Sequence, residues 1–378
     1  MLNSRTAALH QLHRAIVTSP ELIPDTYFAI NIHDQPFGTA WGYSRAANPT
    51  FRSKATDDRN FLMPHFAFWA WKLPFVGSIG RAAAAIEQLE RNEYPRLADK
   101  IPRAVWRGTA WFNSVHNPRL RQNLLAAAKG KDWADVEALN WVGGGGTNGQ
   151  NASNALAIED FCRYRYVLHT EGVAYSGRFQ FLQMCASVTI TPPIQWLQHT
   201  THLIKPVFSS DLRTIAMNAA NAVERAANTN IVHKRDKGDP RSTTGQEPTS
   251  SATGANNYTR SITTTRRGSR DPAEKRTGLE AWPVSFSGDE ANTVFVAPDW
   301  SDLEETIAWL EAHPAVAQGI AHRQRDLFVG GGYFSPAAEV CYFRALVRGW
   351  SRVVRVDERE WQTKEGTSYE AFTLNNGD

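Results

Sequence analysis

The segment EGVAYSGRFQFLQMCASV, near the middle of the chain, combines residue types that suit the binding of an anion. Gly172 and Gly177 can adopt positive φ and let a ligand approach the main chain closely. Ser176 supplies a hydroxyl, and Arg178 supplies a charged fork that binds two oxygens at once. The apolar run that follows predicts a helix over 176–186, whose first turn would present unpaired N–H groups. These features predict a phosphate site, although an ordinary tight strand-to-helix connection remains the alternative.

A second motif, AVWRGT, repeats this arrangement on another predicted strand. Arg107 lies at the end of the strand and Thr109 lies in the turn that follows. Arg119 and Arg121 come next, where another helix is predicted to begin. Each of these side chains could be an ordinary surface arginine. Together with Arg178 they could instead form a cationic crevice for a diphosphate, because ligands of parallel α/β sheets bind beyond the carboxyl ends of the strands.

The motif INIHDQP places a carboxylate, Asp34, directly after a predicted strand and before the turn at Pro36. A lone carboxylate in such a loop is most often solvated or caps a turn, and the alternative is a general base. His33 and His65 are further candidates for acid or base catalysis. The sequence has no D-x-D pair, no G-x-S-x-G elbow, no Walker loop and no zinc-ligand spacing.

The elements that must position these residues alternate between strands and helices. A helix with an apolar stripe is predicted at 78–92, and another begins near Pro118. In SDLEETIAWLEAH, Ser301 and Glu304 have the spacing of a capping box. The inner stripe of that helix is Leu303, Ile307 and Leu310, and further helices are predicted at 314–328 and 336–350. Strands are predicted at 27–33, 104–109, 163–170, 187–190 and 292–298. This alternation predicts an α/β protein with parallel sheets.

Length and charge limit the number of domains and the kinds of partner that the chain could have. A chain of 378 residues suits two domains, and a net charge of +3 creates no strong field for nucleic acid. No apolar run is long enough to cross a membrane. The segment at about 213–281 is polar, basic over 228–280, and lacks apolar periodicity, which predicts a disordered insertion. A basic arm for an acidic partner is the alternative.

Several motifs, in order along the chain, resemble the CAP10 family. This family, glycosyltransferase family 90, also contains the protein O-glucosyltransferases. The resemblance is carried by AVWRGT, IEDFCRYRYVLHTEGVAYSGRFQFLQMCASV, VFVAPDWSDLEETIAWLEAHP and CYFRALVRGW. It extends over 27–212 and 282–350 and is strongest to fungal members.

The resemblance implies a GT-B fold, in which two Rossmann-like domains face each other across a cleft. We expect residues 1–100 to form the acceptor-side domain and 101–350 to form the domain that binds a UDP-sugar, followed by a tail at 351–378. Only about 30 residues precede INIHDQP, fewer than is usual in the family. The first domain is therefore expected to be incomplete.

The resemblance also implies inverting transfer of glucose or xylose from a UDP-sugar to a hydroxyl, with no cofactor and no essential metal. Asp34 matches the catalytic base, Arg107 and Thr109 lie in the strand and turn that face the donor phosphates, and Arg121 opens the next helix. The pyrophosphate-binding turn is matched by Gly172, Val173, Ala174, Ser176 and Arg178. Cys162 and Cys185 match cysteines that are paired in the family, which leaves Cys341 without a partner.

Partners and location follow from the same resemblance. The expected donor is UDP-glucose or UDP-xylose, and the acceptor is a protein or a glycan. We expect the Golgi or the endoplasmic reticulum, with membrane contact only through an N-terminal anchor outside this chain. The alternative function is a catalytically weak or inactive relative that still binds a nucleotide or a glycan, because an incomplete first domain could fail to place an acceptor.

Overall fold

The protein is described by a computed structural model that covers residues 2–47, 59–142, 151–212, 281–357, 359 and 365–376. The glycine-rich loop at 143–149 and almost all of the predicted insertion at 213–281 lie outside these residues. No helix in the described ranges is both long enough and apolar enough to span a bilayer.

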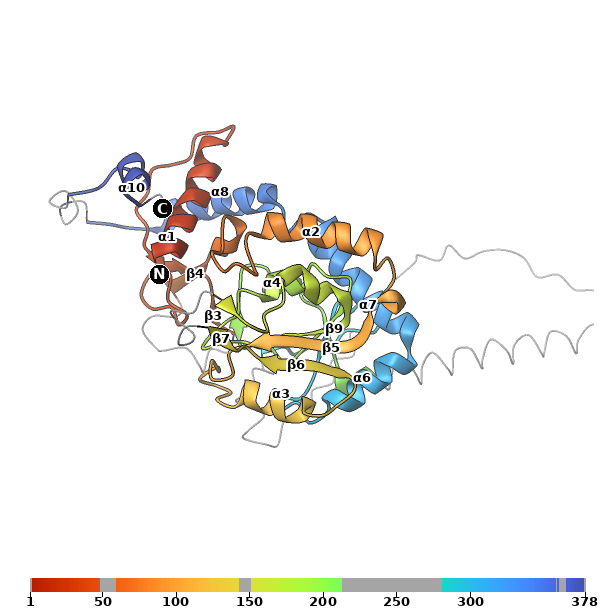
Figure 1. The fold of residues 1–378 in the computed structure, drawn as a ribbon. Helices are drawn as coiled ribbons and strands as arrows, with labels where there is room; N and C mark the ends of the chain where they lie inside the picture. The colour runs from red at the N-terminus through yellow and green to blue at the C-terminus, as the bar shows by residue number, and fades with distance from the viewer. Residues whose placement is uncertain are drawn as a thin grey trace, which may run out of the picture.

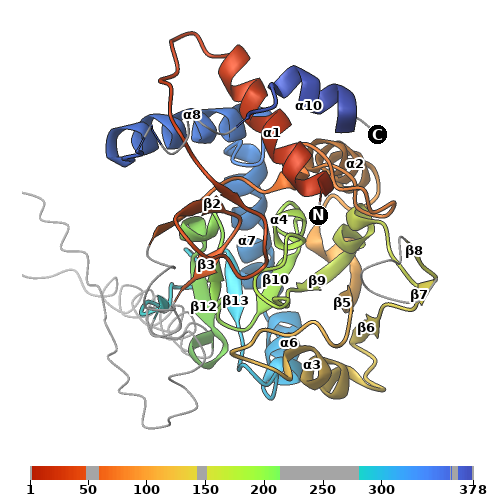
Figure 2. The ribbon, with the colours of Figure 1, turned by 90° about the vertical axis from the view of Figure 1, so that its left-hand side faces the viewer.

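A six-stranded sheet forms the centre of the molecule, and all of its neighbouring strands run parallel. Figure 2 shows the strands side by side in the order β12, β13, β10, β9, β5, β6. Their bounds are β12 (Pro206–Phe208), β13 (Thr293–Phe295), β10 (Val188–Thr191), β9 (Tyr164–Leu168), β5 (Ile101–Gly108) and β6 (Ala134–Ala138). The predicted α/β class is confirmed. The finer GT-B arrangement stays a prediction.

The strand order reverses next to β5. The chain passes from β5 to its neighbour β6 on one side, and then returns to β9 on the other side of β5. Such a reversal leaves an opening at the carboxyl ends of the two strands, where open α/β sheets bind their ligands. The two motifs with arginines, AVWRGT and the segment after β9, leave the sheet at this opening.

Helices cover both faces of the sheet. One face packs on α3 (Leu120–Ala128), α6 (Leu303–Ala312) and α7 (Pro314–Arg325), and the other on α2 (Ile79–Asn92) and α4 (Phe179–Leu182) (Figure 1). The alternation along β5 explains the two cores, because successive side chains of a strand point to opposite faces. Val105 belongs to the core under α2, and Trp106 belongs to the core over α3 and α6.

A second, three-stranded parallel sheet is built from the first 62 residues, in the order β1-β2-β4. Its strands are β1 (Ile30–Asn31), β2 (Ala40–Gly42) and β4 (Asn60–Leu62), and helix α1 (Leu2–Val17) packs beside them. The long helix α8 (Pro336–Val353) joins the same core through Phe343 and Val347. A helix from the far end of the chain therefore completes this N-terminal unit.

The shorter elements make connections and single turns. They are β3 (Arg45–Ala46), β7 (Trp141–Val142), β8 (Asn151–Ala152), β11 (Trp196–Leu197), η3 (Phe66–Phe68), η4 (Leu97–Asp99), η5 (Ile158–Arg163), η6 (Thr201–Leu203), η9 (Asp326–Gly330) and α10 (Tyr369–Asn376). Of these, β3 and β11 form an antiparallel pair that joins the N-terminal unit to the main sheet.

The predicted elements agree with the structure at most places, with three corrections. The strand predicted at 27–33 is only two residues long, and the helix predicted at 176–186 is a single turn over Phe179–Leu182. Helix α6 begins after Asp302 rather than Ser301, and no side chain caps it, so the predicted capping box is wrong. Its inner stripe of Leu303, Ile307 and Leu310 is buried as predicted.

Candidate functional site

Two predicted arginines meet at the opening between β5 and β9. The Nη1 atom of Arg121, in the first turn of α3, donates to the carbonyl of Thr109 at 2.8 Å, and its Nε donates to the carbonyl of Glu171 at 3.1 Å. Arg178 reaches the same place from the segment after β9 and donates to the carbonyl of Arg107. The structure therefore brings the two motifs together.

The electrostatics of this pair are unusual for buried cations. Arg121 is only 5% exposed, and within the described ranges neither Arg121 nor Arg178 forms an ion pair with a carboxylate. Burial lowers the pKa of Arg121 to about 9, and the charge of Arg178 adds to this shift. Burial lowers the pKa of Arg178 to about 10. Arg178 is half-buried beside Arg121. Two like charges that are partly removed from water, with no carboxylate partner among the described residues, are costly, so the site favours an anion.

The indole of Trp106 forms one wall of this cationic pair. Each guanidinium carbon lies 5.8 Å from the ring of Trp106, which is fully buried. A π-face attracts a cation, and the attraction is stronger out of water. The ring therefore offsets part of the free-energy cost of removing both charges from water. It does so without adding a carboxylate to the pair. Gly108 makes room for the ring, because a Cβ there would lie 2.5 Å from Trp106 Cζ2.

Arg107 has a different environment. Its Nη2 lies 2.6 Å from the carboxylate of Asp135 on β6, and its Nη1 donates to the carbonyls of Trp106 and Asp135. Its guanidinium charge is therefore already neutralised within the sheet. Only the main-chain carbonyl of Arg107 takes part in the cationic pair, as the acceptor for Arg178.

The turn between β9 and α4 differs from the expected anion cradle. Neither Gly172 nor Gly177 has positive φ. Gly177 instead permits close packing, since a Cβ there would lie 2.5 Å from Nε2 of His65. The single-turn helix α4 is too short to provide the expected dipole, so Arg178 itself supplies the positive charge.

The rest of the turn is fixed by the N-terminal unit. Ala174 is fully buried against Ala46 and Trp196, the residues that pair β3 with β11. The N–H of Gly172 donates to the carbonyl of Ala174 at 2.9 Å and closes the turn. Val173 and Ser176 are half-buried beside it. The turn is thus held from both units of the molecule.

Asp34 lies in the surface loop after β1. The hydroxyl of Ser44 donates to the Asp34 carbonyl at 3.2 Å. Partial burial raises the pKa of the Asp34 carboxyl, and the charge of His33 opposes the shift. The negative charge of Asp34 also contributes to raising the pKa of Tyr175 in the turn, after burial and Tyr43. Asp34 therefore lies within electrostatic reach of the turn that carries Arg178.

A family model described as glycosyl transferase family 90 matches residues 2–209, which is more than half of the chain. The chain belongs to glycosyltransferase family 90. Asp34, Arg121, Arg178 and both cysteines of the predicted pair lie in the matched range. Helices α6, α7 and α8 lie outside it, so the resemblance noted over 282–350 stays a prediction.

Curated relatives carry related names. Protein O-glucosyltransferase 1 of Homo sapiens is 28% identical over 189 residues, covering 49% of this chain and 47% of that protein. O-glucosyltransferase rumi of Drosophila melanogaster is 29% identical over 195 residues, covering 49% of this chain and 46% of that protein. The chain spans about half the length of the curated relatives it matches.

The disulfide implied for this family 90 protein is present between Cys162 and Cys185. It joins η5, just before β9, to the segment just after α4, so it brackets the turn that carries Arg178. Nζ of the buried Lys100 donates to the Cys162 carbonyl at 2.7 Å. Cys341 on α8 is exposed and has a free thiol.

The sequence reasoning missed one residue of the site in this family 90 protein, Glu171. Its side chain is 6% exposed and lies at the end of β9, next to Gly172. Burial raises its pKa to about 8, while hydrogen bonds from the Trp196 and Gln195 main chain act against the shift. The signal was available, because an acidic residue directly after an apolar strand at the carboxyl edge is a binding candidate.

The described residues of this family 90 protein contain no group of three or more His, Cys, Asp or Glu side chains placed to hold a metal ion. Whether the reaction needs a metal is therefore left as the prediction made from the resemblance.

Proposed function

We propose that this family 90 protein is an inverting glycosyltransferase that moves glucose or xylose from a UDP-sugar to a hydroxyl of a protein or glycan acceptor. The observation that carries the proposal is the pair of guanidiniums of the buried Arg121 and the half-buried Arg178, which have no carboxylate partner among the described residues. A nucleoside diphosphate is an anion of the right charge for two such cations.

The two arginines would act mainly on the leaving group. Negative charge grows on the diphosphate as its bond to the sugar breaks, and fixed cations in a water-poor site stabilise that charge. Burial keeps both side chains in place before the donor arrives, because each already donates to a main-chain carbonyl. Arg107, which Asp135 already neutralises, would support the strand rather than bind the phosphates.

Asp34 would take the proton from the attacking hydroxyl. The direction of its pKa shift supports this role, since a carboxyl with a raised pKa is a stronger base than an ordinary one. Attack from the face opposite the diphosphate needs only this one carboxylate and inverts the anomeric carbon. The names of the relatives support glucose as the transferred sugar and a protein as the acceptor. We also propose residence in the secretory pathway and a reaction without an essential metal.

Titration of the folded protein with UDP by calorimetry tests the donor site. We expect wild-type protein to bind UDP and Arg178→Ala to lose at least about 100-fold in affinity, because a charge-assisted, bidentate contact is removed. Arg119→Ala is the matched control, since Arg119 is exposed and makes no capping hydrogen bond at α3. Absence of UDP binding by the folded wild type would overturn the proposal.

Turnover separates the transferase from a binding relative. With UDP-glucose, UDP-xylose and a panel of protein and glycan acceptors, Asp34→Asn should bind UDP normally but transfer about 10²–10⁴-fold more slowly. UDP binding without transfer to any acceptor would favour the catalytically inactive relative. Repeating the assay with a chelator tests the expected independence from metal ions.

A further inference from the structure

A short hairpin next to the candidate site carries a triplet of residues that the proposed function does not use. Strands β7 and β8 form an antiparallel pair, in which Trp141 lies opposite Ala152 and Val142 lies opposite Asn151. Figure 2 shows this pair at the edge of the molecule, beyond β5 and β6. The triplet Asn-Ala-Ser at 151–153 begins on β8, and it is an acceptor sequence for N-linked glycosylation.

Both reactive members of the triplet lie on the outer side of the hairpin. Successive residues of a strand point to opposite sides. Ala152 is buried, with 5% of its surface exposed, whereas Asn151 and Ser153 on either side of it are exposed. An enzyme that modifies the triplet must reach the amide of Asn151 and the hydroxyl of Ser153, and the structure leaves both accessible.

The two reactive groups are also free of competing hydrogen bonds within the described part of the chain. Asn151 uses its Oδ1, which accepts from the N–H of Ala152 at 2.9 Å, while its Nδ2 has no described partner. Ser153 uses its main-chain N–H, which donates to the Asn140 carbonyl at 3.0 Å, while its hydroxyl has no described partner. The amide nitrogen that would be modified is therefore available.

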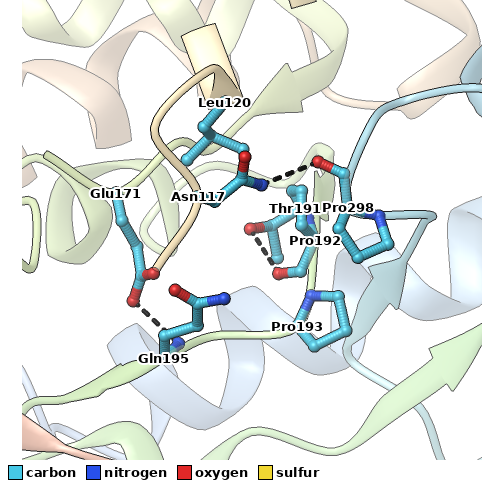
Figure 3. Close-up of a pocket in the computed structure, with 8 residues that line it drawn as sticks. All are labelled: Asn117, Leu120, Glu171, Thr191, Pro192, Pro193, Gln195 and Pro298. Carbon is cyan, nitrogen blue, oxygen red and sulfur yellow. Dashed lines mark hydrogen bonds between the residues drawn. The ribbon is translucent and has the colours of Figure 1, made fainter. Parts of the chain in front are cut away.

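Other asparagines near the carboxyl edge of the sheet are engaged by the fold. Nδ2 of Asn154 donates to the Ala138 carbonyl at 2.8 Å. Nδ2 of Asn117 donates to the Pro298 carbonyl at 2.9 Å (Figure 3). Neither of them begins an acceptor triplet. The free amide and the triplet thus coincide at Asn151.

A second observation points to a compartment in which this modification occurs. Cys162 and Cys185 form a disulfide, and both are fully buried. Disulfides form and persist in oxidising compartments such as the lumen of the endoplasmic reticulum. N-linked glycans are added in the same lumen, so the disulfide supports the modification independently of the triplet.

We propose that Asn151 carries an N-linked oligosaccharide. In this modification, Nδ2 of Asn151 forms a bond to the anomeric carbon of an oligosaccharide, and the bond from that carbon to a lipid-linked diphosphate breaks. The diphosphate leaves with the electron pair, and the amide nitrogen loses one proton. The co-reactant is therefore a lipid diphosphate oligosaccharide of the host cell. The proposal rests on the secretory residence proposed above, but not on the activity of the protein itself.

The position of the hairpin indicates what the glycan does. Val142, opposite Asn151, is 58% exposed, and the hairpin has only two strands, so its edges are unpaired. A bulky, hydrophilic glycan covers such an apolar edge and opposes association between chains. The indole of Trp141 donates to Thr109 Oγ1 at 3.0 Å, which places the hairpin beside the turn after β5. The glycan then lies at the rim of the proposed donor site.

Peptide mass spectrometry tests the assignment. The full chain is isolated from its own cells and, separately, from a eukaryotic host that directs it through the secretory pathway. An amidase that cleaves the link between glycan and asparagine turns a modified Asn151 amide into a carboxylate, which changes the mass of its peptide. We expect this change at Asn151 in both preparations, together with faster electrophoretic migration after the enzyme.

Variants made in the secretory host separate the triplet from the rest of the hairpin. Asn151→Gln and Ser153→Ala should each lose one glycan, whereas Ser153→Thr should keep it because the hydroxyl is retained. Asn140→Gln is the matched control, since Asn140 is an exposed asparagine next to the same hairpin and begins no triplet. All variants are compared in an Asn257→Gln background, which removes a second triplet outside the described residues. Thermal unfolding checks that each variant is folded.

Each other outcome overturns a defined claim. An unmodified Asn151 in the folded protein from the secretory host rejects the glycan and leaves the proposed function standing. Modification in the host but not in the protein's own cells rejects the secretory residence, and with it the glycan on the native protein. A glycosylated, folded protein that does not bind UDP rejects the proposed function and leaves the glycan assignment standing.

Discussion

Charged side chains have different partners at the two ends of the six-stranded sheet. At the amino ends of β9 and β10, Nζ of Lys100 lies 2.7 Å from Glu90 Oε1 and 3.0 Å from Ser187 Oγ. Arg325 pairs with the other oxygen of Glu90 at 3.0 Å. At the carboxyl ends, Arg121 and Arg178 find only carbonyls within the described residues. A carboxylate pairs with both cations at the first end, whereas no described carboxylate pairs with either cation at the second.

This difference in partners distinguishes a charge that stabilises the fold from a charge that is available to a ligand. Lys100 directly follows η4, and it is 2% exposed. Its Nζ donates to Glu90 on α2 and to the Cys162 carbonyl. Burial lowers its pKa, and Glu90 opposes the shift. A buried cation is therefore not by itself a sign of function. What distinguishes a binding site is a buried cation whose counter-charge the protein does not supply.

Removing the counter-charge at the amino end should have the largest effect on stability. Glu90→Gln leaves the buried Lys100 and the partly exposed Arg325 side by side without a carboxylate. We expect a loss of about 3–5 kcal/mol in the free energy of unfolding. Denaturant titration measures it, and a loss no greater than that of an exposed pair would remove the contrast between the two ends.

Removing a cation at the carboxyl ends of the strands should have the opposite effect on the free energy of unfolding. Arg178→Met removes a cation that has no carboxylate, so we expect the free energy of unfolding without ligand to change by no more than about 1 kcal/mol or to rise. UDP affinity should fall about 100-fold in the same variant. Unfolding with and without UDP measures both effects. A large loss of stability without ligand would show that Arg178 holds the fold.

An effect that appears only as the pH rises is expected at Glu171. Its pKa of about 8 in the folded protein exceeds the value of about 4.3 for an unfolded chain, so between these values the folded state binds the extra proton. The free energy of unfolding therefore falls as pH rises through this window. Glu171→Gln should be more stable than wild type by about 4–5 kcal/mol at pH 8, because each unit of pKa shift corresponds to about 1.4 kcal/mol.

The same comparison at pH 4 is the control for Glu171. Both proteins carry a neutral side chain there, so their stabilities should converge. Parallel stability curves from pH 4 to pH 8.5 would mean that folding does not shift the pKa of Glu171.

The smallest effect is expected at the surface. Nζ of Lys131 lies 2.7 Å from Glu304, but both side chains are largely in water, with exposures of 41% and 55%. Lys131→Met should leave the unfolding midpoint unchanged within error, because exposed pairs contribute little. A shift as large as that of Glu90→Gln would mean that burial does not decide the importance of an ion pair here.

Much of the fold follows from local sequence. Helix α2 has its predicted extent, and the Oγ of Ser78 accepts from Arg81 N as its N-cap. The predicted strands at 104–109 and 163–170 correspond to β5 and β9. Because both run to the same edge, the sequence also indicated that Arg121 and Arg178 would meet. The strand order could not be predicted from the sequence, because it depends on pairings between segments that are far apart in the chain.

The missed features depend on partners that are far apart in the chain. Asp135 neutralises Arg107 only because of the register between β5 and β6. The contact of Gly177 with His65 joins two different units, and local sequence carries no sign of it. The Lys100, Glu90 and Arg325 network likewise joins three separate elements. Glu171 was visible in the sequence, but its burial by Gln195 and Trp196 was not.

The packing of α8 has a consequence for the order of events during synthesis. Trp41, on β2, is fully buried in a core that also needs Phe343, Val347 and Trp350. The indole of Trp350 donates to the Tyr27 carbonyl at 2.6 Å. A ribosome makes β1, β2 and β4 first, yet their core can close only after α8 has emerged. These three strands therefore leave the tunnel long before their core can close, and their exposed aromatic side chains are natural ligands for chaperones in the interval.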